Sequence, residues 1–368
     1  MSKKLRHVLG ISGGKDSAAL AIYTKTKYPA LDLEFYSCDT GKELDETYQL
    51  IKNLEVYLGI KINLLQAAQN SSEDPFDHFL KMYGGYLPSS NSRWCTKKLK
   101  LDPFEKYVGA DPVVSYVGIR GDEEREGYIS TKKNIQSIFP FRKNIWSEDV
   151  IAKLFSAQNY ENLQIISNDI DFGRFQDKAN SIISKKVDVT FTQAQKLNSL
   201  LDIDIKGLNH LVFNFLKTTD YPLGKEESFP LLDNEDILVR ADIFKILEES
   251  GVGVPAYYNK VDFDVDGKKG QYSRSRSGCY FCFFQQKIEW VWLYEQHPEL
   301  YKKAMQYEKD GYTWGQFESL EELIQPTRMK QIKEDYIKKM EKNSQSKSPY
   351  LIDILDDAEG EGCASCFI

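Results

Sequence analysis

The feature that most constrains this 368-residue chain is a glycine-containing hexapeptide, Ser12-Gly13-Gly14-Lys15-Asp16-Ser17. The apolar run 8–11 precedes it, and a run of small and apolar residues follows from Ala18 onward. We interpret this order as strand, loop and helix. Two adjacent glycines let backbone N–H groups approach phosphate oxygens closely. The N-terminus of the following helix presents its free N–H groups and positive dipole end to the same anion. The hexapeptide therefore predicts a phosphate-binding loop.

The loop departs from two common phosphate motifs. It has no glycine five residues before Gly14, and Asp16 follows the lysine where a P-loop has Ser or Thr. The GxGxxG spacing of dinucleotide-binding folds is also missing. Neither a P-loop nucleotidase nor a dinucleotide-binding domain is therefore expected.

Apolar runs and helical periodicities alternate along the first part of the chain. Strands are expected at 31–37, 60–65 and 113–119, and a helix is expected at 43–58, where Gly59 ends it. This alternation predicts an α/β fold with a doubly wound, mainly parallel sheet. The acidic run that ends in Asp266-Gly267 predicts a hairpin turn, because Ser273 stands where a calcium loop needs Glu.

Later segments have a different pattern. Leu208, Leu211, Val212, Phe215 and Leu216 form a helical stripe, which predicts a helical insertion, although the same segment is open to being a continuation of the main core. Further helices are expected at 237–249 and within 284–341. We divide the chain into a nucleotide-binding core, a helical insertion, a completion of the core, and a helical C-terminal region with a flexible cysteine-containing tail: 1–155, 156–235, 236–290 and 291–368.

Four more segments occur in an order typical of one enzyme family. They are Cys38-Asp39-Thr40-Gly41, Arg93-Trp94-Cys95-Thr96, Gly118-Ile119-Arg120-Gly121-Asp122-Glu123 and Ser277-Gly278-Cys279-Tyr280-Phe281-Cys282. With the loop, they resemble the PP-loop ATP pyrophosphatases of the phosphoadenosine phosphosulfate (PAPS) reductase family. The resemblance covers 1–150 and 235–290 and implies an adenine nucleotide alpha-hydrolase-like fold.

The resemblance also implies a nucleotide site. ATP would be held by Ser12, Gly13, Gly14, Lys15, Asp16, Ser17, Ser37, Asp39, Gly118 and Arg120. Arg120 suits the α-phosphate, because a planar guanidinium binds phosphate in a bidentate manner. Mg²⁺ is expected with ATP, and Asp39 is a candidate to help bind it. Lys15, Asp16, Asp39, Arg120 and Cys95 are the catalytic candidates. Two alternatives stay open: Asp39 as a strand-end cap, and Arg120 in a surface ion pair with Asp122 or Glu123.

The chain has six cysteines, four of which form the CxxC pairs Cys279/Cys282 and Cys363/Cys366. In a reducing compartment such pairs indicate metal, cluster or redox sites. One option adds Cys95 to Cys279 and Cys282 and gives a three-cysteine iron–sulfur cluster of the 4Fe-4S type. Its open iron would hold hydrosulfide, as the resemblance to tRNA-thiolating relatives implies. The other option adds the tail pair, and four thiolates fit Zn²⁺ or a cluster equally.

We favour the first option, because Cys95 lies in the segment that resembles the family's active site. The tail pair would then exchange persulfides or disulfides, or else carry idle thiols at a frayed end. Cys38 is expected to be a small core residue.

Basic residues surround both cysteine segments. Arg93, Lys97, Lys98 and Lys100 flank Cys95, while Lys268, Lys269, Arg274 and Arg276 precede Cys279. These residues could form a basic rim that binds a polyanionic acceptor. They are equally consistent with a loop whose charged side chains are only solvated. Lys and Arg number 48 against 55 Asp and Glu, a net charge of −7, which excludes a generally basic nucleic-acid coat.

Three functions follow from these observations. The first is an ATP-dependent sulfurtransferase, most similar to the DndC/SspD-type enzymes of bacterial DNA phosphorothioation, a DNA modification used in defence. Its acceptor would be the DNA backbone phosphate, and its partners a cysteine desulfurase and other DNA-modification proteins. The second is a PAPS or adenylylsulfate reductase that releases sulfite. The third is a non-catalytic nucleotide-sensing adaptor. No apolar run reaches ~18 residues, and the apolar stretch 8–11 is too short for a secretion signal, so a cytoplasmic protein without a membrane span is expected.

Overall fold

The computed structural model describes residues 4–123, 129–309, 311–315 and 318–344. At its centre lies a five-stranded sheet in the order β3-β2-β1-β4-β5, in which every neighbouring pair is parallel. The strands are β1 (Arg6–Gly10), β2 (Leu33–Asp39), β3 (Asn63–Gln66), β4 (Val113–Tyr116) and β5 (Ile135–Ile138). The predicted parallel α/β fold is thus confirmed, and β5 is a strand that the sequence reading did not name.

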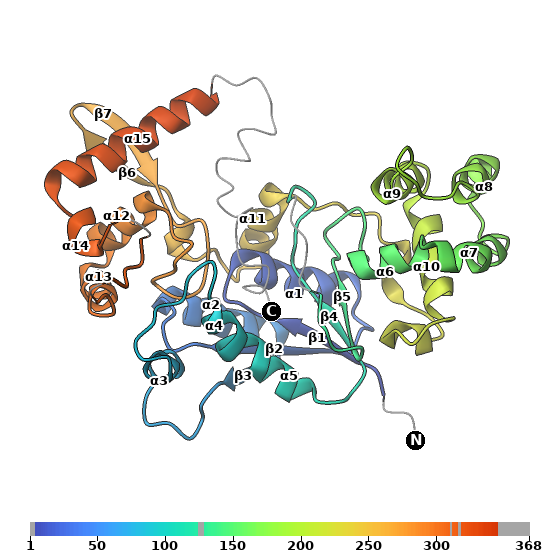
Figure 1. Cartoon of the computed structure of the whole chain (residues 1–368), viewed down its shortest axis with the longest axis horizontal. Helices are drawn as coiled ribbons and strands as arrows, with labels where there is room; N and C mark the ends of the chain where they lie inside the picture. Colours follow the sequence, from blue (N-terminus) through green and yellow to red (C-terminus); the bar gives the residue numbers. More distant parts are fainter. Residues whose placement is uncertain (1–3, 124–128, 310, 316–317, 345–368) are drawn as a thin grey trace.

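Helices cover both faces of this sheet (Figure 1). Leu9 and Phe35 point to the face that carries α1 (Lys15–Lys27) and α2 (Asp45–Leu58), while their neighbours Val8 and Tyr36 pack on the opposite face with Phe104 of α5 (Asp102–Val108). Successive side chains of a strand point to opposite faces, so a sheet covered on both sides needs continuous apolar runs. The runs in β1 and β2 meet that need.

The strand order creates a crevice at one edge of the sheet. Strands β2 and β3 lie on one side of β1, and β4 and β5 lie on the other. In such sheets, ligands bind outside the carboxyl ends of the strands at the point where the order reverses. The loop 11–14 after β1 and the loop 117–123 after β4 flank that point.

Residues 156–235 contain helices and no strand. The five apolar residues of the predicted stripe lie on one helix, α10, and are fully buried. They share one hydrophobic core with the sheet and α1, so this segment packs directly on the sheet domain. Its helices, after α6 (Glu148–Leu154), are η2 (Ala157–Asn159), α7 (Tyr160–Ser167), η3 (Gly173–Phe175), α8 (Gln176–Ile183), α9 (Gln193–Leu201), α10 (Ile205–Leu216), η4 (Pro222–Lys225) and η5 (Pro230–Asp233).

The C-terminal part lies at the opposite end of the molecule from α7–α10 (Figure 1). Its hairpin turns at Asp266 and Gly267, whose φ angles are 50° and 79°, as Asp-Gly in a tight turn requires. Its elements are η6 (Ala256–Tyr258), β6 (Val261–Val265), β7 (Lys268–Tyr272), α12 (Lys287–Gln296), α13 (Pro298–Met305), α14 (Leu320–Leu323) and α15 (Pro326–Ser344). Helix α11 (Arg240–Glu249) precedes them and packs on α1 near the middle of the molecule. A second, aromatic-rich core holds the C-terminal part to α3 (Pro75–Met82), α4 (Trp94–Thr96) and η1 (Lys97–Leu101).

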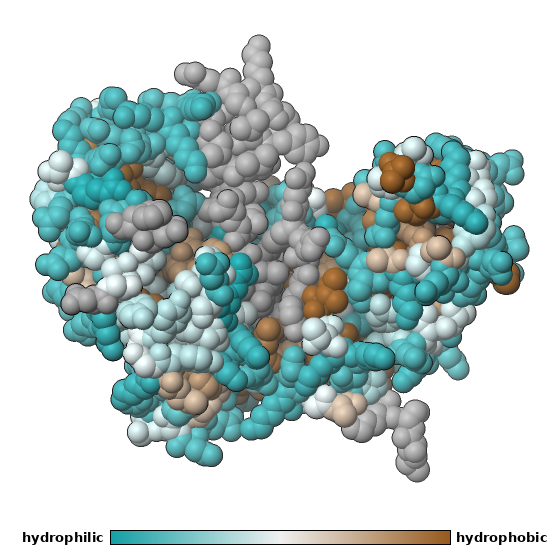
Figure 2. Space-filling view, in the orientation of Figure 1, coloured by the Kyte–Doolittle hydropathy of each residue, from teal (hydrophilic) through white to brown (hydrophobic). Residues whose placement is uncertain are grey.

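The visible surface is mainly hydrophilic, with apolar patches at the end that carries α8 and α9 and near the middle of the molecule (Figure 2). None of the helices in the described ranges has both the length and the apolar content that crossing a membrane requires. The tail with Cys363 and Cys366 lies outside the described residues.

Candidate functional site

The phosphate loop is a tight turn between β1 and α1. Gly13 has a φ of +74°, a left-handed conformation that L side chains rarely adopt. The turn is closed by its own serines: the Oγ atoms of Ser12 and Ser17 are 3.1 Å apart, and Ser17 donates to the carbonyl of Gly14 at 3.2 Å. These bonds fix the path of the backbone before any ligand binds.

Helix α1 starts directly at this turn. Its N-cap residue is Gly14, so no side chain caps the first turn, and the helix runs for 13 residues. Free N–H groups at a helix N-terminus form an anion site. The Lys15 N–H contacts the hydroxyl of Tyr258 at 3.5 Å, a weak bond. The local structure predicted for the hexapeptide is therefore the one observed.

Buried charges surround the start of α1. Lys15, Asp16 and Arg120 are each 2 % exposed or less. Asp16 accepts from Lys15 Nζ at 3.1 Å through one oxygen and from Arg120 Nη1 at 3.0 Å through the other. Buried charges are stable only when they are paired, so these groups hold one another in place.

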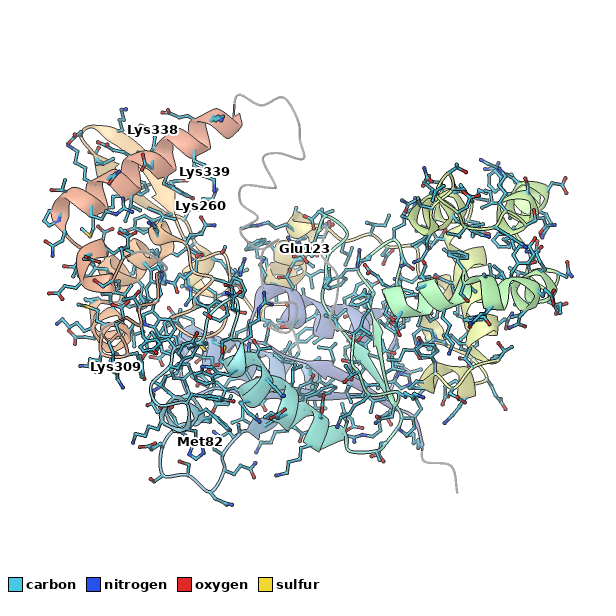
Figure 3. The ribbon with its side chains drawn as sticks, in the orientation of Figure 1. Met82, Glu123, Lys260, Lys309, Lys338 and Lys339 are labelled. Carbon is cyan, nitrogen blue, oxygen red and sulfur yellow. The ribbon has the colours of Figure 1, made fainter. Side chains whose placement is uncertain are left out.

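Arg120 is also bound by its own loop. Its Nε donates to Asp122 at 2.9 Å, and its Nη1 lies 2.8 Å from Glu123. Glu123 lies beside α11 near the middle of the molecule (Figure 3). The alternative of a surface ion pair is therefore wrong in one respect: both carboxylates do pair with Arg120, but the side chain is 0 % exposed. The loop reaches α1 because Gly118 has no side chain; a Cβ there would lie 2.9 Å from the Asp16 carbonyl.

Asp39 ends β2, and its oxygens are occupied by protein donors. One accepts from the Gly41 N–H and the Tyr48 hydroxyl, both at 2.9 Å, and the other from the Gln66 amide at 2.8 Å. This arrangement is that of a strand-end cap, the alternative left open above. Ser37, two residues earlier, is buried in the same strand.

The three cysteines of the favoured sulfur site come together. Cys95, at the start of α4, lines one cavity of about 60 Å³ with Cys279 and Cys282. The walls are largely apolar: Phe76, Phe281, Phe283, Phe284 and Trp314. Segments almost 200 residues apart in the chain therefore converge, as the interpretation of Cys95 requires.

The cysteine box also adjoins the loops at the sheet edge. A Cβ built on Gly14 would lie only 2.5 Å from Ser277 Oγ, so the box packs directly on the phosphate loop. Cys279 pairs with Glu43 in a β-bridge, and its sulfur lies 3.2 Å from Thr40 Oγ1. The phosphate loop, the Asp39 turn and the cysteine box are thus neighbours.

The surroundings act on the thiols in opposite directions. Burial raises the pKa of both Cys279 and Cys282, and the nearby Glu43 carboxylate raises that of Cys279 further. Arg276, Arg274 and Lys100 pull the pKa of Cys282 downward without overcoming burial. Both thiols are therefore protonated near neutral pH unless a metal or a base removes the proton.

The predicted basic rim is wrong at Arg274. This side chain is 3 % exposed and donates to the carbonyl of Cys279 at 2.9 Å. Its Nε and Nη1 have no hydrogen-bond partner among the described residues. Tyr257 lies on one side of its guanidinium, with 6.0 Å between the guanidinium carbon and the ring centre. A buried positive charge that has no carboxylate partner in the described part of the chain therefore lies against the cysteine box.

Sequence reasoning missed two tyrosines of η6. The Tyr257 hydroxyl donates to the Gly13 carbonyl at 3.0 Å, and Lys15 Nζ lies 5.0 Å from the centre of the Tyr258 ring. They lie more than 240 residues after the loop, in no recognised motif, and only the fold brings them there.

Within the described ranges, no group of three or more His, Cys, Asp or Glu side chains is arranged to hold a metal ion. The donor chemistry of the cavity does fit: three thiols face one space, and thiolates are the ligands that iron–sulfur clusters and Zn²⁺ prefer.

Comparison with known proteins gives a family match for the N-terminal part of the chain. Residues 6–163 match the family described as phosphoadenosine phosphosulfate reductase domain. An uncharacterized protein of Methanocaldococcus jannaschii is 34 % identical over 141 residues, which are 38 % of this chain and 27 % of that protein. An uncharacterized nin region protein of Escherichia phage lambda is 29 % identical over 172 residues, 40 % of this chain and 58 % of its own length.

The chain thus spans less than two thirds of these relatives. Among solved structures, a PAPS reductase from Candida auris in complex with phosphate is 19 % identical, with a TM-score of 0.28 over 45 % of this chain and 79 % of that one. The region that carries the phosphate loop, the Asp39 turn, Cys95 and Arg120 is therefore similar to the PAPS reductase domain family.

Proposed function

We propose that this protein is an ATP pyrophosphatase that adenylates an acceptor for sulfur transfer, and that the acceptor is the DNA backbone phosphate. The observation that carries the proposal is the contact between the phosphate loop and the cysteine box, where Gly14 leaves no room for a Cβ beside Ser277. A nucleotide phosphate on the loop would then lie next to a cavity lined by three thiols.

The proposed chemistry has two steps. An acceptor oxygen attacks the α-phosphorus of ATP, the bond to the bridging oxygen breaks, and pyrophosphate leaves. A sulfur nucleophile at the oxidation level of hydrosulfide then attacks the activated acceptor, and AMP departs with the oxygen. Activation replaces one difficult substitution by two easier ones.

The chain's own residues would bind and orient the nucleotide. The N–H groups at the start of α1 and Lys15 would hold the phosphates. Arg120, fixed by Asp16, Asp122 and Glu123, would face the α-phosphate without a search for its rotamer. Since three carboxylates stand here against two cations, ATP would enter with Mg²⁺ to balance the charge.

The cavity thiols would hold the sulfur carrier. Cys95, Cys279 and Cys282 would be the ligands of an iron–sulfur cluster, with Zn²⁺ as the alternative. Such a cluster would supply a place to hold inorganic sulfur close to the nucleotide. A cysteine desulfurase would provide that sulfur, and other DNA-modification proteins would present the acceptor.

The decisive experiment measures pyrophosphate released from ATP by the anaerobically purified protein, with DNA and a desulfurase present. Wild type and Lys25→Ala, which changes an exposed lysine later on α1, should release pyrophosphate and AMP in equal amounts. Lys15→Ala should not. ATP left intact under all these conditions would contradict the proposal.

The match of residues 6–163 to the PAPS reductase domain favours a second candidate, a PAPS or adenylylsulfate reductase. Such an enzyme would release sulfite from the activated nucleotide and leave ATP untouched. Incubation with PAPS and a thiol reductant, followed by a sulfite assay, separates the two functions.

The sulfur carrier has a separate test. Serine at Cys95, Cys279 or Cys282 should each lower the iron content and the absorbance near ~400 nm. The matched control is Cys38→Ser, because Cys38 packs in another hydrophobic cluster and its thiol donates to the Lys100 carbonyl at 3.6 Å. A colourless wild-type protein that contains zinc would show that the three cysteines bind Zn²⁺ and no iron–sulfur cluster.

A further inference from the structure

At one edge of the cysteine cavity, the ring of Phe284 lies close to two arginines, Arg93 and Arg276; we call this group of residues the mouth of the cavity. The guanidinium carbon of Arg93 lies 4.9 Å from the centre of the Phe284 ring, and that of Arg276 lies 5.6 Å from it. Phe283 packs beside Phe284, with 4.3 Å between ring centres, and both rings line the cavity. The two arginines come from the two cysteine segments, each within a few residues of a cavity cysteine.

These two arginines differ from two of the lysines nearby, which are paired with carboxylates. Lys98 pairs with Asp102 at 2.8 Å, and Lys42 is held by two aspartates. In contrast, Arg93 and Arg276 pair with no carboxylate in the part of the chain that the structure describes. Lys97, exposed one turn after Arg93, has no such pair there either.

A third arginine, Arg274, adds positive charge in the interior beside the cysteine box. Arg274 is nearly fully buried, and two of its nitrogens have no hydrogen-bond partner among the described residues. Buried donors without partners are costly, so their presence points to an anion that completes them. Within the described ranges, three guanidinium groups without carboxylate partners therefore adjoin one cysteine box, in a chain whose net charge is −7.

We propose that this mouth binds a single-stranded or unpaired stretch of polynucleotide. Arg93 and Arg276 would contact its phosphates, while Phe283 and the guanidinium planes would stack against a base. Stacking needs an exposed base face, which a closed duplex does not offer. The inference rests on the proposed function and specifies its acceptor: a nucleotide taken out of the duplex, whose backbone then reaches the sulfur cavity.

The test is fluorescence anisotropy without ATP, with a labelled DNA of about 12 nucleotides, within the usual range for one single-strand site. The same sequence is also measured as a duplex. The single strand should bind more tightly, and its affinity should fall as salt rises from ~50 to ~200 mM. Equal or tighter binding of the duplex would overturn the proposal.

Variants locate the site. The double variant Arg93→Gln/Arg276→Gln should weaken single-strand binding roughly tenfold or more and reduce the salt slope by about 1.4, since each phosphate contact on a single strand contributes about 0.7. The matched control is Lys143→Gln/Lys206→Gln, which removes the same charge from two lysines paired with Asp202 and Glu235. Equal binding by the two double variants would overturn the proposal.

The aromatic part is tested by Phe283→Leu, which keeps an apolar side chain at the cavity wall. It should weaken binding roughly tenfold with an unchanged salt slope, because stacking is lost and no charge is. Arg93→Lys/Arg276→Lys should recover the salt slope but not the full affinity, because lysine does not stack. Poly-glutamate that competes as well as unlabelled oligonucleotide would assign the mouth to an acidic peptide instead and overturn the proposal.

Failure here differs from failure of the proposed function. Lys15→Ala should lose pyrophosphate release and keep oligonucleotide binding. Wild type that binds the oligonucleotide through the arginines but never cleaves ATP would retain this site and contradict the proposed reaction. Wild type that cleaves ATP but does not bind single strands would support the proposed reaction and contradict the polynucleotide site.

Discussion

Arg120 and Asp16 face each other across the crevice of the sheet, with 3.0 Å between Nη1 and Oδ1 and both side chains buried. One belongs to the loop after β4 and the other to the first turn of α1. This ion pair therefore ties together the two loops that flank the proposed nucleotide site.

The first prediction concerns this pair. Arg120→Gln should lower the free energy of unfolding by about 3–5 kcal/mol, because the buried carboxylate of Glu123 loses this cation and that of Asp16 keeps Lys15 alone. Pyrophosphate release should be lost as well. Urea unfolding followed by circular dichroism measures the first effect. The control Arg174→Gln changes an exposed arginine stacked on Phe175 and should cost less than ~1 kcal/mol. A stable Arg120→Gln protein would show that the carboxylates find other partners.

The second prediction tests the contact between the phosphate loop and the cysteine box. Gly14→Ala places a Cβ 2.5 Å from Ser277 Oγ and should raise the dissociation constant for ATP roughly tenfold, since overpacking costs ~1–3 kcal/mol. Ser277→Gly removes the obstructing hydroxymethyl group. The double variant should therefore bind ATP almost as well as Ser277→Gly alone. Calorimetric titration of the four proteins gives the coupling, and additive losses would place the two segments apart.

The third prediction concerns Tyr257, whose hydroxyl donates to the carbonyl of Gly13. Tyr257→Phe keeps the ring and removes one buried hydrogen bond, which should cost about 1 kcal/mol of stability. Because the bond shapes the loop, KM for ATP should rise several-fold while kcat changes little. The control Tyr307→Phe removes a hydrogen bond to Asp77, away from the phosphate loop. A fall in kcat with KM unchanged would assign Tyr257 a role in the chemical step instead.

A structural feature could be predicted from the sequence when it depends on residues close together in the chain. The hexapeptide turn and the parallel strands around it were predictable, because glycine conformations and apolar runs act over a few residues. The convergence of Cys95 with Cys279 was implied only by the family resemblance. Burial of Arg274 was not predictable, because a cluster of basic residues in the sequence does not indicate that Tyr257 will pack on one of them. The pairing of Arg120 with Asp16 depends on long-range packing in the same way.

The last prediction follows from Lys196 on α9. Its side chain is buried, and its ammonium donates to the carbonyls of Ile183 at 2.8 Å and Lys185 at 2.5 Å, at the end of α8. Burial lowers the pKa of Lys196 from 10.5 to about 8. Between these two pH values the unfolded chain binds the proton and the folded protein does not. The free energy of unfolding should therefore rise with pH across this window, by about 3 kcal/mol from this group.

Lys196→Met has no proton to lose, so the difference in unfolding free energy between wild type and variant should change by that amount from pH 8 to pH 10.5. At about pH 7 and lower the difference should be constant, because both states of wild type are then protonated. Lys185→Met, at an exposed lysine two residues after α8, is the matched control and should follow wild type. Urea unfolding at several pH values gives the comparison. If the Lys196→Met curve runs parallel to wild type through the window, the ammonium keeps its charge in the folded protein, and its two carbonyl partners offset burial in full.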